Sequence, residues 1–149
     1  MNISIREGRE EDLPEIFELI KELALFEKAP EQVTNTIDRM RKEGFGDNPV
    51  YSFFVAENQS GIIGAAIHYI RYSTWKGARL FLEDLIVKES FRGLGAGSLL
   101  FEKCIELGKK QGYSGMTWQV LDWNQPAIDL YNKYNSQLEA GWLNANLDY

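Results

Sequence analysis

A glycine-rich segment in the second half of the chain has the residue types of an anion-binding turn. Residues 87–98 read Val-Lys-Glu-Ser-Phe-Arg-Gly-Leu-Gly-Ala-Gly-Ser, between a strongly apolar stretch and an amphipathic one. Glycines at such a junction let the main chain approach a ligand closely and direct several N–H groups at it. The N-terminus of the following helix adds partial positive charge, and Arg92 adds a permanent cation. The segment therefore favours a pyrophosphate as its ligand.

Two familiar nucleotide-binding motifs fit this segment less well. A Walker loop ends in Gly-Lys-Ser or Gly-Lys-Thr, whereas this turn ends in Ala96-Gly97-Ser98 and has no lysine there. The dinucleotide fingerprint requires a third glycine where Ser98 stands, together with a βαβ unit early in the chain. The plain structural alternative is a connection between a strand and a helix that binds nothing.

The composition restricts the remaining chemistry. The 149 residues include one cysteine, Cys104, and one histidine, His68. These counts exclude an internal disulfide framework and a cysteine zinc cluster, and they make a Ser-His-Asp triad or a His-rich metal site hard to build. We expect no metal, a core position for Cys104 on an apolar helical stripe, and a strand position without catalytic duty for His68.

The charge balance is acidic, with 22 Asp and Glu against 16 Lys and Arg and a net charge of -6. Such a surface repels phosphate backbones and attracts cationic small molecules, so we expect no nucleic-acid partner. No stretch approaches the roughly 20 apolar residues of a membrane span, and the first residues lack the features of a signal peptide. We expect a soluble protein of a reducing compartment, the cytoplasm, with no membrane partner.

The hydrophobic pattern predicts the elements that position the turn. The length fits one domain, residues 1–149, without linker or repeat. The expected strands lie around residues 3–5 and at 52–57, 62–72, 79–87, 116–121 and 142–149, and the expected helices at 13–23, 34–43, 95–111 and 124–134. This order predicts a mixed α/β fold with antiparallel strands in the middle and a crossover late in the chain.

The pattern Arg92-x-x-Gly95-x-Gly97 after an apolar strand resembles the acyl-CoA signature of the GNAT family of N-acetyltransferases. The element order resembles that family's fold, a central mixed β-sheet flanked by about four helices, over nearly the whole chain. Further segments are similar to the polyamine and thialysine acetyltransferase branch, and most similar to its thialysine subgroup. These segments are residues 21–24, 26–28, 44–49, 72–77, 82–84 and 121–125, with Asn124 and the pair Leu130-Tyr131 matching a later motif.

The resemblance implies acetyl-CoA as the cofactor. In the family, the strand before the turn pairs through its main chain with the pantetheine arm, and the amides of the turn hold the pyrophosphate. A main-chain N–H near Ile86 is expected to polarise the thioester carbonyl. The positions implied in cofactor binding are Leu85, Ile86, Val87, Arg92, Gly93, Leu94, Gly95, Ala96, Gly97, Ser98, Asn124, Ala127 and Tyr131.

The resemblance also implies two catalytic residues. The acetyl group passes directly from the thioester to an amine, which arrives as an ammonium and must lose a proton. Glu83 matches the carboxylate that accepts this proton, directly or through water, and Tyr131 matches the tyrosine that protonates the CoA sulfur. Asp84 is expected on the opposite face of a regular strand. The structural alternatives are a solvated or ion-paired Glu83 and a Tyr131 that packs on the sheet.

The positions that match the family's acceptor site combine carboxylates with aromatic rings, which suits an aliphatic ammonium. They are Phe26, Glu27, Tyr72, Trp75, Glu83 and Asp84. Ser73 stands where polyamine enzymes tend to carry an acidic residue, so an anchor for a second ammonium is missing. We therefore favour a thialysine-like or lysine-like amine, or a short diamine, over spermidine.

A departure from the family pattern lies after Tyr131. Lys133-Tyr134-Asn135 stands where the family usually has basic residues and then glycine, and asparagine can adopt the same left-handed conformation. The branch forms dimers, so we expect a homodimer. Two alternatives stay open at this point: a protein lysine or N-terminal acetyltransferase, and a catalytically silent acyl-CoA-binding module.

Overall fold

The computed structural model describes residues 2–149. The chain divides into two compact units, one up to Gln119 and one from Val120 to Tyr149. Among the helices of the described chain, none has both the length and the apolar character that crossing a membrane requires.

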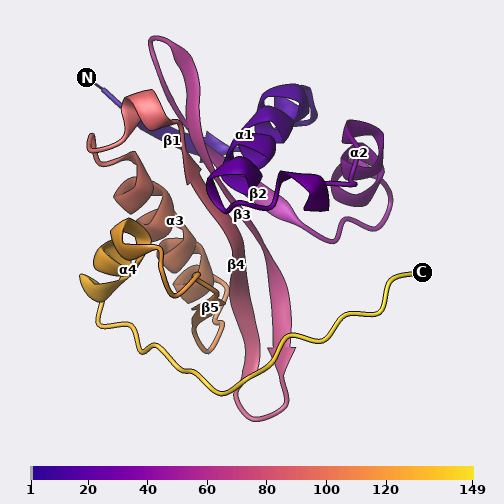
Figure 1. Ribbon diagram of the computed structural model, residues 1–149, viewed down its shortest axis with the longest axis vertical. Coiled ribbons are helices and arrows are strands. Elements are labelled where there is room, and N and C mark those ends of the chain that lie inside the picture. Colours follow the sequence, from indigo (N-terminus) through magenta and orange to yellow (C-terminus); the bar gives the residue numbers. More distant parts are fainter. Residues whose placement is uncertain (1) are drawn as a thin grey trace. The chain divides into compact units, whose positions relative to one another are not determined.

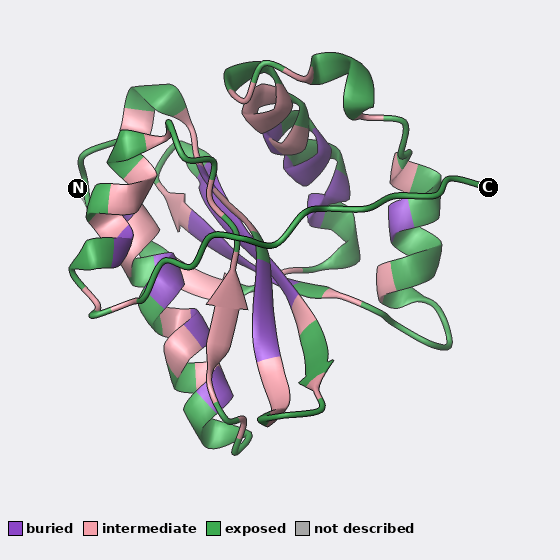
Figure 2. Cartoon of the chain, turned by 60° about the horizontal axis from the view of Figure 1, so that its bottom comes forward, coloured by how far each residue is buried: buried purple, intermediate pink, exposed green. Residues whose placement is uncertain are grey.

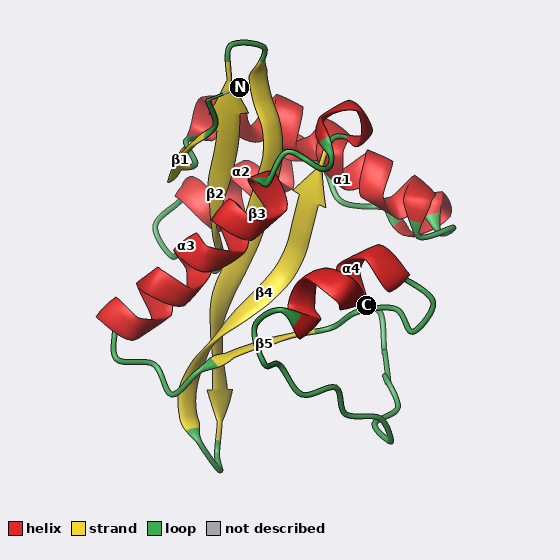
Figure 3. Ribbon diagram, turned by 90° about the vertical axis from the view of Figure 1, so that its left-hand side faces the viewer, coloured by secondary structure: helices red, strands yellow, loops and turns green. Residues whose placement is uncertain are grey.

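The first unit is a five-stranded sheet with helices on both faces (Figures 1 and 3). In spatial order, the strands are β1 (Ser4–Glu7), β2 (Ser52–Asn58), β3 (Gly61–Ser73), β4 (Gly77–Val87) and β5 (Met116–Trp118). The pairs from β1 to β4 are antiparallel, and β5 is parallel to β4. Helices α1 (Leu13–Phe26) and α2 (Ile37–Phe45) cover one face, and α3 (Ala96–Lys110) covers the other. The predicted mixed α/β fold is confirmed.

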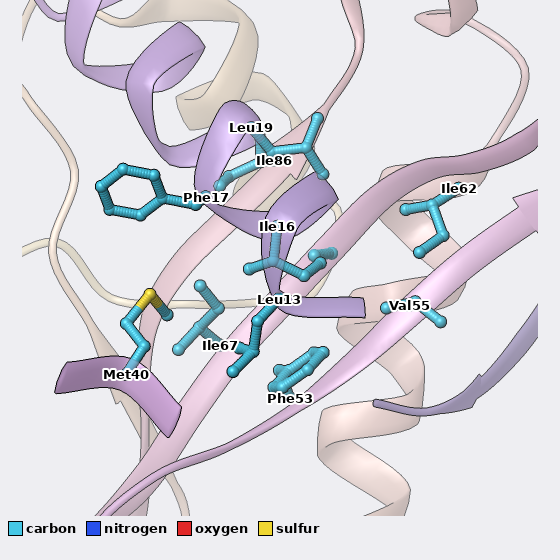
Figure 4. Close-up of a cluster of buried hydrophobic side chains, with 11 residues drawn as sticks. Leu13, Ile16, Phe17, Leu19, Met40, Phe53, Val55, Ile62, Ile67 and Ile86 are labelled. Carbon is cyan, nitrogen blue, oxygen red and sulfur yellow. The ribbon is translucent and has the colours of Figure 1, made fainter. Parts of the chain in front are cut away.

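The core under α1 and α2 follows from the spacing of apolar residues. Leu13, Ile16 and Phe17 recur at helical intervals and pack on the sheet, where Val55 and Ile67 alternate with residues of the other face (Figure 4). Each fully buried aliphatic side chain of this kind contributes about 1.5–3 kcal/mol to folding. The buried segments of α1 and of the central strands lie toward one another (Figure 2).

The start of α1 is fixed to β1 by an ion pair. Arg6 on β1 donates to both carboxylate oxygens of Asp12, at 2.8 and 3.0 Å, and the main-chain N–H of Arg9 donates to Asp12 at 2.8 Å. These donors hold the pKa of Asp12 below its usual value. The pair orients the helix whose far end reaches the candidate site.

The single histidine and the single cysteine both lie in the core beneath α3, which confirms the core position expected for Cys104 and the strand position expected for His68. His68 is 6% exposed, its ring centroid is 4.9 Å from that of Phe54, and its Nε2 has no hydrogen-bond partner within residues 2–149. Burial lowers the pKa of His68 to about 4 and raises the pKa of Cys104 to about 12. Both side chains are therefore neutral at physiological pH, and Cys104 is not an activated nucleophile.

The second unit contains α4 (Gln125–Asn132). Asn124 caps this helix, since its Oδ1 accepts a hydrogen bond from the N–H of Ala127 at 3.4 Å, and Pro126 occupies the first turn. Asn135 has a φ of 57°, so the expected left-handed asparagine is confirmed.

Two predicted strands differ from the structure. The strand expected at 116–121 ends at Trp118, and the strand expected at 142–149 is wrong, because these residues form neither helix nor strand (Figure 3). The last stretch, Trp-Leu-Asn-Ala-Asn-Leu-Asp-Tyr, has no regular alternation and is rich in Asn, Asp and Ala, which disfavour strands.

Candidate active site

The edge of β4 that faces β5 is open over its last residues. β5 pairs only with Leu80, Phe81 and Leu82, whereas β3 pairs with β4 as far as Val87. The N–H of Lys88 donates to Ile63 on the β3 side at 2.8 Å, which fixes how main-chain groups alternate along β4. An extended ligand can therefore add to this edge as a strand would.

The alternation refines one expectation. Because Lys88 faces β3, the N–H of Ile86 also faces β3, and the main-chain groups of Leu85 and Val87 face the open edge. The carbonyl of Val87 confirms this direction, since it accepts a hydrogen bond from Arg92 Nε at 3.2 Å. We expected a main-chain N–H near Ile86 to polarise a thioester carbonyl. The N–H groups available at the open edge are those of Leu85 and Val87, because the N–H of Ile86 is directed to β3.

The glycine-rich turn leads from this edge into α3. Gly93 and Gly95 have φ values of 80° and 92°, in the left-handed region that favours glycine, and Gly95 is the N-cap of α3. The first helical hydrogen bond runs from the N–H of Leu99 to the carbonyl of Gly95 at 3.1 Å. The amides of Ala96, Gly97 and Ser98 precede it and have no acceptor within the helix. This geometry fits a pyrophosphate at the helix N-terminus.

Arg92 connects the turn to two other elements. Besides its hydrogen bond to Val87, its guanidinium lies 5.2 Å from the ring centroid of Phe26, at the end of α1. This contact is within the range of a cation–π interaction. Arg92 therefore links the end of β4, the start of α3 and the end of α1.

A β-bulge in β4 sets the direction of two carboxylates. Ile67 pairs with Asp84 and His68 pairs with Leu82, so Glu83 is an additional residue without a partner on β3. The bulge changes the alternation, and Glu83 and Asp84 consequently lie on the same face, the one covered by α1. The expectation that Asp84 points to the opposite face is wrong, because it assumed a regular strand.

Glu27, at the end of α1, completes a group that we term the acidic cluster: Glu27, Glu83 and Asp84. Burial raises the pKa of Asp84 to about 7, with further contributions from the charges of Glu83 and Glu27. Burial and the charge of Glu83 also raise the pKa of Glu27. These mutual effects place the three carboxyl groups within electrostatic reach of one another.

The acidic cluster carries the charge that attracts an organic cation. Across residues 2–149, no three His, Cys, Asp or Glu side chains converge as ligands for a metal. An ammonium group, in contrast, pairs with carboxylates that are spread around it. The cluster is therefore a candidate site for an amine in its protonated form.

Tyr69 on β3 is a site residue that the sequence did not indicate. Its hydroxyl donates to Glu83 Oε1 at 3.0 Å, and its ring centroid lies 5.2 Å from that of Phe81. Tyr69 pairs with Phe81 in the sheet, and Glu83 is two residues beyond Phe81 on the same face. Only the strand register, which the sequence does not specify, brings Tyr69 to Glu83.

The aromatic residues expected around the acceptor are divided between two places. Phe26 lies beside Arg92 at the end of α1. Tyr72 and Trp75, on the β3–β4 hairpin, are 74% and 89% exposed, and no hydrogen bond or ring contact within residues 2–149 joins them to the acidic cluster. The structure thus brings Phe26 to the site and leaves Tyr72 and Trp75 on the surface.

Comparison with known proteins identifies this architecture. Residues 13–135 match the Acetyltransferase (GNAT) family. The chain belongs to the GNAT acetyltransferase family. This membership confirms the family resemblance that the glycine-rich turn indicated.

Two relatives of this GNAT enzyme, from distant animals, carry the same name. A protein of Bos taurus named thialysine N-epsilon-acetyltransferase is 40% identical over 94% of this chain and 89% of the bovine one. A protein of the same name from Caenorhabditis elegans is 35% identical over 90% of this chain and 84% of its own. An aminoglycoside acetyltransferase from an uncultured soil metagenomic sample superposes with a TM-score of 0.81 at 17% identity, covering 98% of this chain and 97% of that one.

The α4 residues of this GNAT enzyme belong to the second unit. Ala127 and Tyr131 are one helical turn apart and so share a face of α4. The hydroxyl of Ser136 donates to the carbonyl of Tyr131 at 3.0 Å, which helps to close the end of the helix. The roles of Asn124, Ala127 and Tyr131 toward acetyl-CoA stay predictions.

Proposed function

We propose that this GNAT acetyltransferase acetylates the primary amine of a small cationic acceptor, with a thialysine-like or lysine-like amine preferred over spermidine. The observation that carries this proposal is the acidic cluster, placed by the β4 bulge beside the open edge of β4. The names of the relatives at 35–40% identity support the same acceptor class.

The cofactor in this proposal is acetyl-CoA, which supplies the acetyl group as an activated thioester. The main chain at Leu85 and Val87 would hold its extended arm, and the amides from Gly93 to Ser98 with Arg92 would hold its pyrophosphate. The proposed cofactor site keeps all the positions named from the sequence, including Asn124, which caps α4, and Ala127 and Tyr131 on α4. No metal takes part in the proposal.

The protons in this reaction balance as follows. Glu83 accepts one proton from the ammonium, directly or through water, and the nitrogen lone pair then attacks the thioester carbonyl. When the carbon–sulfur bond breaks, the phenol of Tyr131 gives its proton to the sulfur. The second proton lost by the nitrogen restores the phenol, and the proton on Glu83 returns to solvent. The products are an amide and a free thiol.

The assembly and location of the protein form a separate part of the proposal. We propose a homodimer, with residues 1–149 acting as one domain, since the family match covers residues on both sides of Gln119. The exposed Ile70, Tyr72 and Trp75 on the β3–β4 hairpin supply an apolar surface for a second copy. Light scattering would show twice the chain mass of 17.1 kDa.

The single cysteine supports a cytoplasmic location, which cell fractionation would test.

An acetyl-CoA consumption assay over a panel of acceptors tests the function. The panel contains thialysine, lysine, spermidine, putrescine and a histone-tail peptide. We expect the highest kcat/KM with thialysine, and a decrease of about 100-fold in Glu83→Gln that is largest at low pH, where the amine is most protonated. A preference for the peptide would indicate protein acetylation, and tight CoA binding without transfer to any amine would indicate a silent binding module.

A further inference from the structure

The side chain of Glu83 accepts one hydrogen bond from the described residues, and its donor is the hydroxyl of Tyr69. It donates to Oε1 at 3.0 Å. The other oxygen, Oε2, accepts no hydrogen bond from the described residues. One oxygen of the carboxylate is thus held by the protein, and the other is left to react.

Tyr69 is itself held firmly, whereas Glu83 is not. Tyr69 lies in the paired part of β3, opposite Phe81, and the two rings are 5.2 Å apart at an angle of 32°. The guanidinium of Arg71 lies 5.3 Å from the centroid of Phe81 and covers the same ring. Glu83 stands at the bulge, where the β3–β4 ladder gives it no partner. Its carboxylate therefore takes its orientation from Tyr69.

We propose that Tyr69 is a positioning residue for acetyl transfer, which binds Oε1 of Glu83 and thereby directs Oε2 to the proton of the acceptor ammonium. This inference rests on the proposed function, in which Glu83 is the base. It adds a residue that does not itself touch the reacting atoms.

The charged groups around the pair keep Tyr69 a hydrogen-bond donor. Burial and the charges of Glu83 and Asp84 raise the pKa of Tyr69 to about 12, although Arg71 opposes this effect, so the phenol is protonated throughout the assay range. Glu83 also faces Glu27 and Asp84, and its charge helps to raise the pKa of both carboxyl groups. As a donor, the phenol makes a hydrogen bond that favours the charged form of a carboxylate, the form in which a base accepts a proton.

A double-mutant cycle tests the inference. Tyr69→Phe retains the ring against Phe81 and removes only the hydroxyl. We expect kcat to fall about 10-fold, with the KM for acetyl-CoA unchanged and the acidic limb of the pH–rate profile moved to higher pH. In the Glu83→Gln background, the same substitution should lower kcat by less than twofold, because the group on which it acts is gone. Equal losses in both backgrounds would overturn the inference.

Tyr51→Phe is the matched control. The hydroxyl of Tyr51 donates to the carbonyl of Met40 at 2.6 Å, away from the acidic cluster, and its pKa is also raised to about 12. We expect Tyr51→Phe to lower the melting temperature without moving the pH–rate profile. If the two variants change the rate and the profile alike, the role of Tyr69 is merely structural.

A second measurement compares the wild type with Glu83→Gln and does not need the Tyr69→Phe variant. With tyrosine labelled at Cζ, NMR titration should show the Tyr69 phenol pKa falling toward 10 in Glu83→Gln. An unchanged phenol pKa contradicts the contact. A wild-type protein without acetyl transfer, but with this NMR shift, would contradict the proposed function while the contact between Tyr69 and Glu83 stands.

Discussion

Glu83 and Asp84 are consecutive in sequence and yet lie on the same face of the sheet, because β4 carries one more residue than β3 between the pairs Ile67–Asp84 and His68–Leu82. In a regular strand, one of the two carboxylates would lie under α3, in the apolar core. The bulge instead places both beneath the end of α1, where Glu27 joins them. The acid proposed to accept a proton and the acid proposed to attract the substrate are thus neighbours.

The acceptor KM should depend on the ionisation of Asp84. With a pKa of about 7, Asp84 is neutral at pH 6 and charged at pH 8, whereas an aliphatic amine stays cationic over this range. The wild-type KM for the acceptor should therefore fall as the pH rises. One additional charge near an ammonium is worth about 1 kcal/mol, or roughly fivefold in KM.

Steady-state kinetics of Asp84→Asn between pH 6 and pH 8 checks this expectation. The variant should have a KM that changes little with pH and stays near the wild-type value at pH 6. Asp38→Asn is a suitable control, since Asp38 pairs with Arg41 on the surface of α2. A wild-type KM that is flat over this range would contradict a role for Asp84 in attracting the amine.

The same carboxyl group should reduce the stability of the fold above neutral pH. An aspartate ordinarily has a pKa of 3.8, and the pKa of Asp84 is about 7 in the folded chain, so the folded state binds more protons than the unfolded state between these values. The free energy of unfolding consequently decreases as the pH rises from about 4 to about 7. We expect Asp84→Asn to raise it by about 2 kcal/mol at pH 8 and to leave it nearly unchanged at pH 4.

Urea unfolding at the two pH values measures this difference directly. The stabilised variant should also lose activity toward the cationic acceptor, since the buried charge that it removes belongs to the proposed binding site. Equal stability of wild type and Asp84→Asn at pH 8 would show that Asp84 is well solvated in the folded protein.

The sequence predicts most of the fold, because periodicity and turn residues are local signals. The helix beginning at Leu13, the long β3–β4 hairpin and the strand–turn–helix around Gly95 are all confirmed. The strand expected at 142–149 is wrong because a strand also needs a pairing partner. Apolar residues are present there, but pairing with another strand is not a local property of the sequence.

The site is less predictable, because it depends on register. Glu83 can be identified in the sequence by its family motif. The shared face of Glu83 and Asp84 follows from a bulge, which no residue type at positions 67–84 predicts. Tyr69 becomes a site residue only through its place opposite Phe81. Contacts across strands depend on a shift of a single residue, which hydrophobic alternation alone does not fix.

Binding of acetyl-CoA should depend on the conformation of the glycine-rich turn. Gly95 has a φ of 92°, and a Cβ at this position would meet no atom of residues 2–149 within 4 Å, so Gly95→Ala strains the backbone without a clash. The left-handed conformation costs other residues about 1–2 kcal/mol. We expect a Kd for CoA that is roughly 10-fold higher by calorimetry.

Gly108→Ala is the control for this substitution. Gly108 lies inside α3, and its added Cβ would make an ordinary contact of 4.0 Å with Tyr113. Since alanine is the better helix former by about 1 kcal/mol, this variant should be as stable as the wild type or more so, with CoA binding unchanged. Equal Kd values for the two variants would argue against a pyrophosphate at the turn.

Tyr131→Phe separates acid catalysis from cofactor binding. The substitution keeps the ring on α4 and removes the hydroxyl proposed to protonate the CoA sulfur, so kcat should fall by about 100-fold. The Kd for CoA should change less than twofold, because the aromatic surface is retained. The loss should be largest at high pH, where solvent supplies the fewest protons to the leaving thiolate. Stopped-flow acetyl transfer with Tyr113→Phe as the control measures these effects, and equal rates of wild type and Tyr131→Phe at every pH would remove Tyr131 from the mechanism.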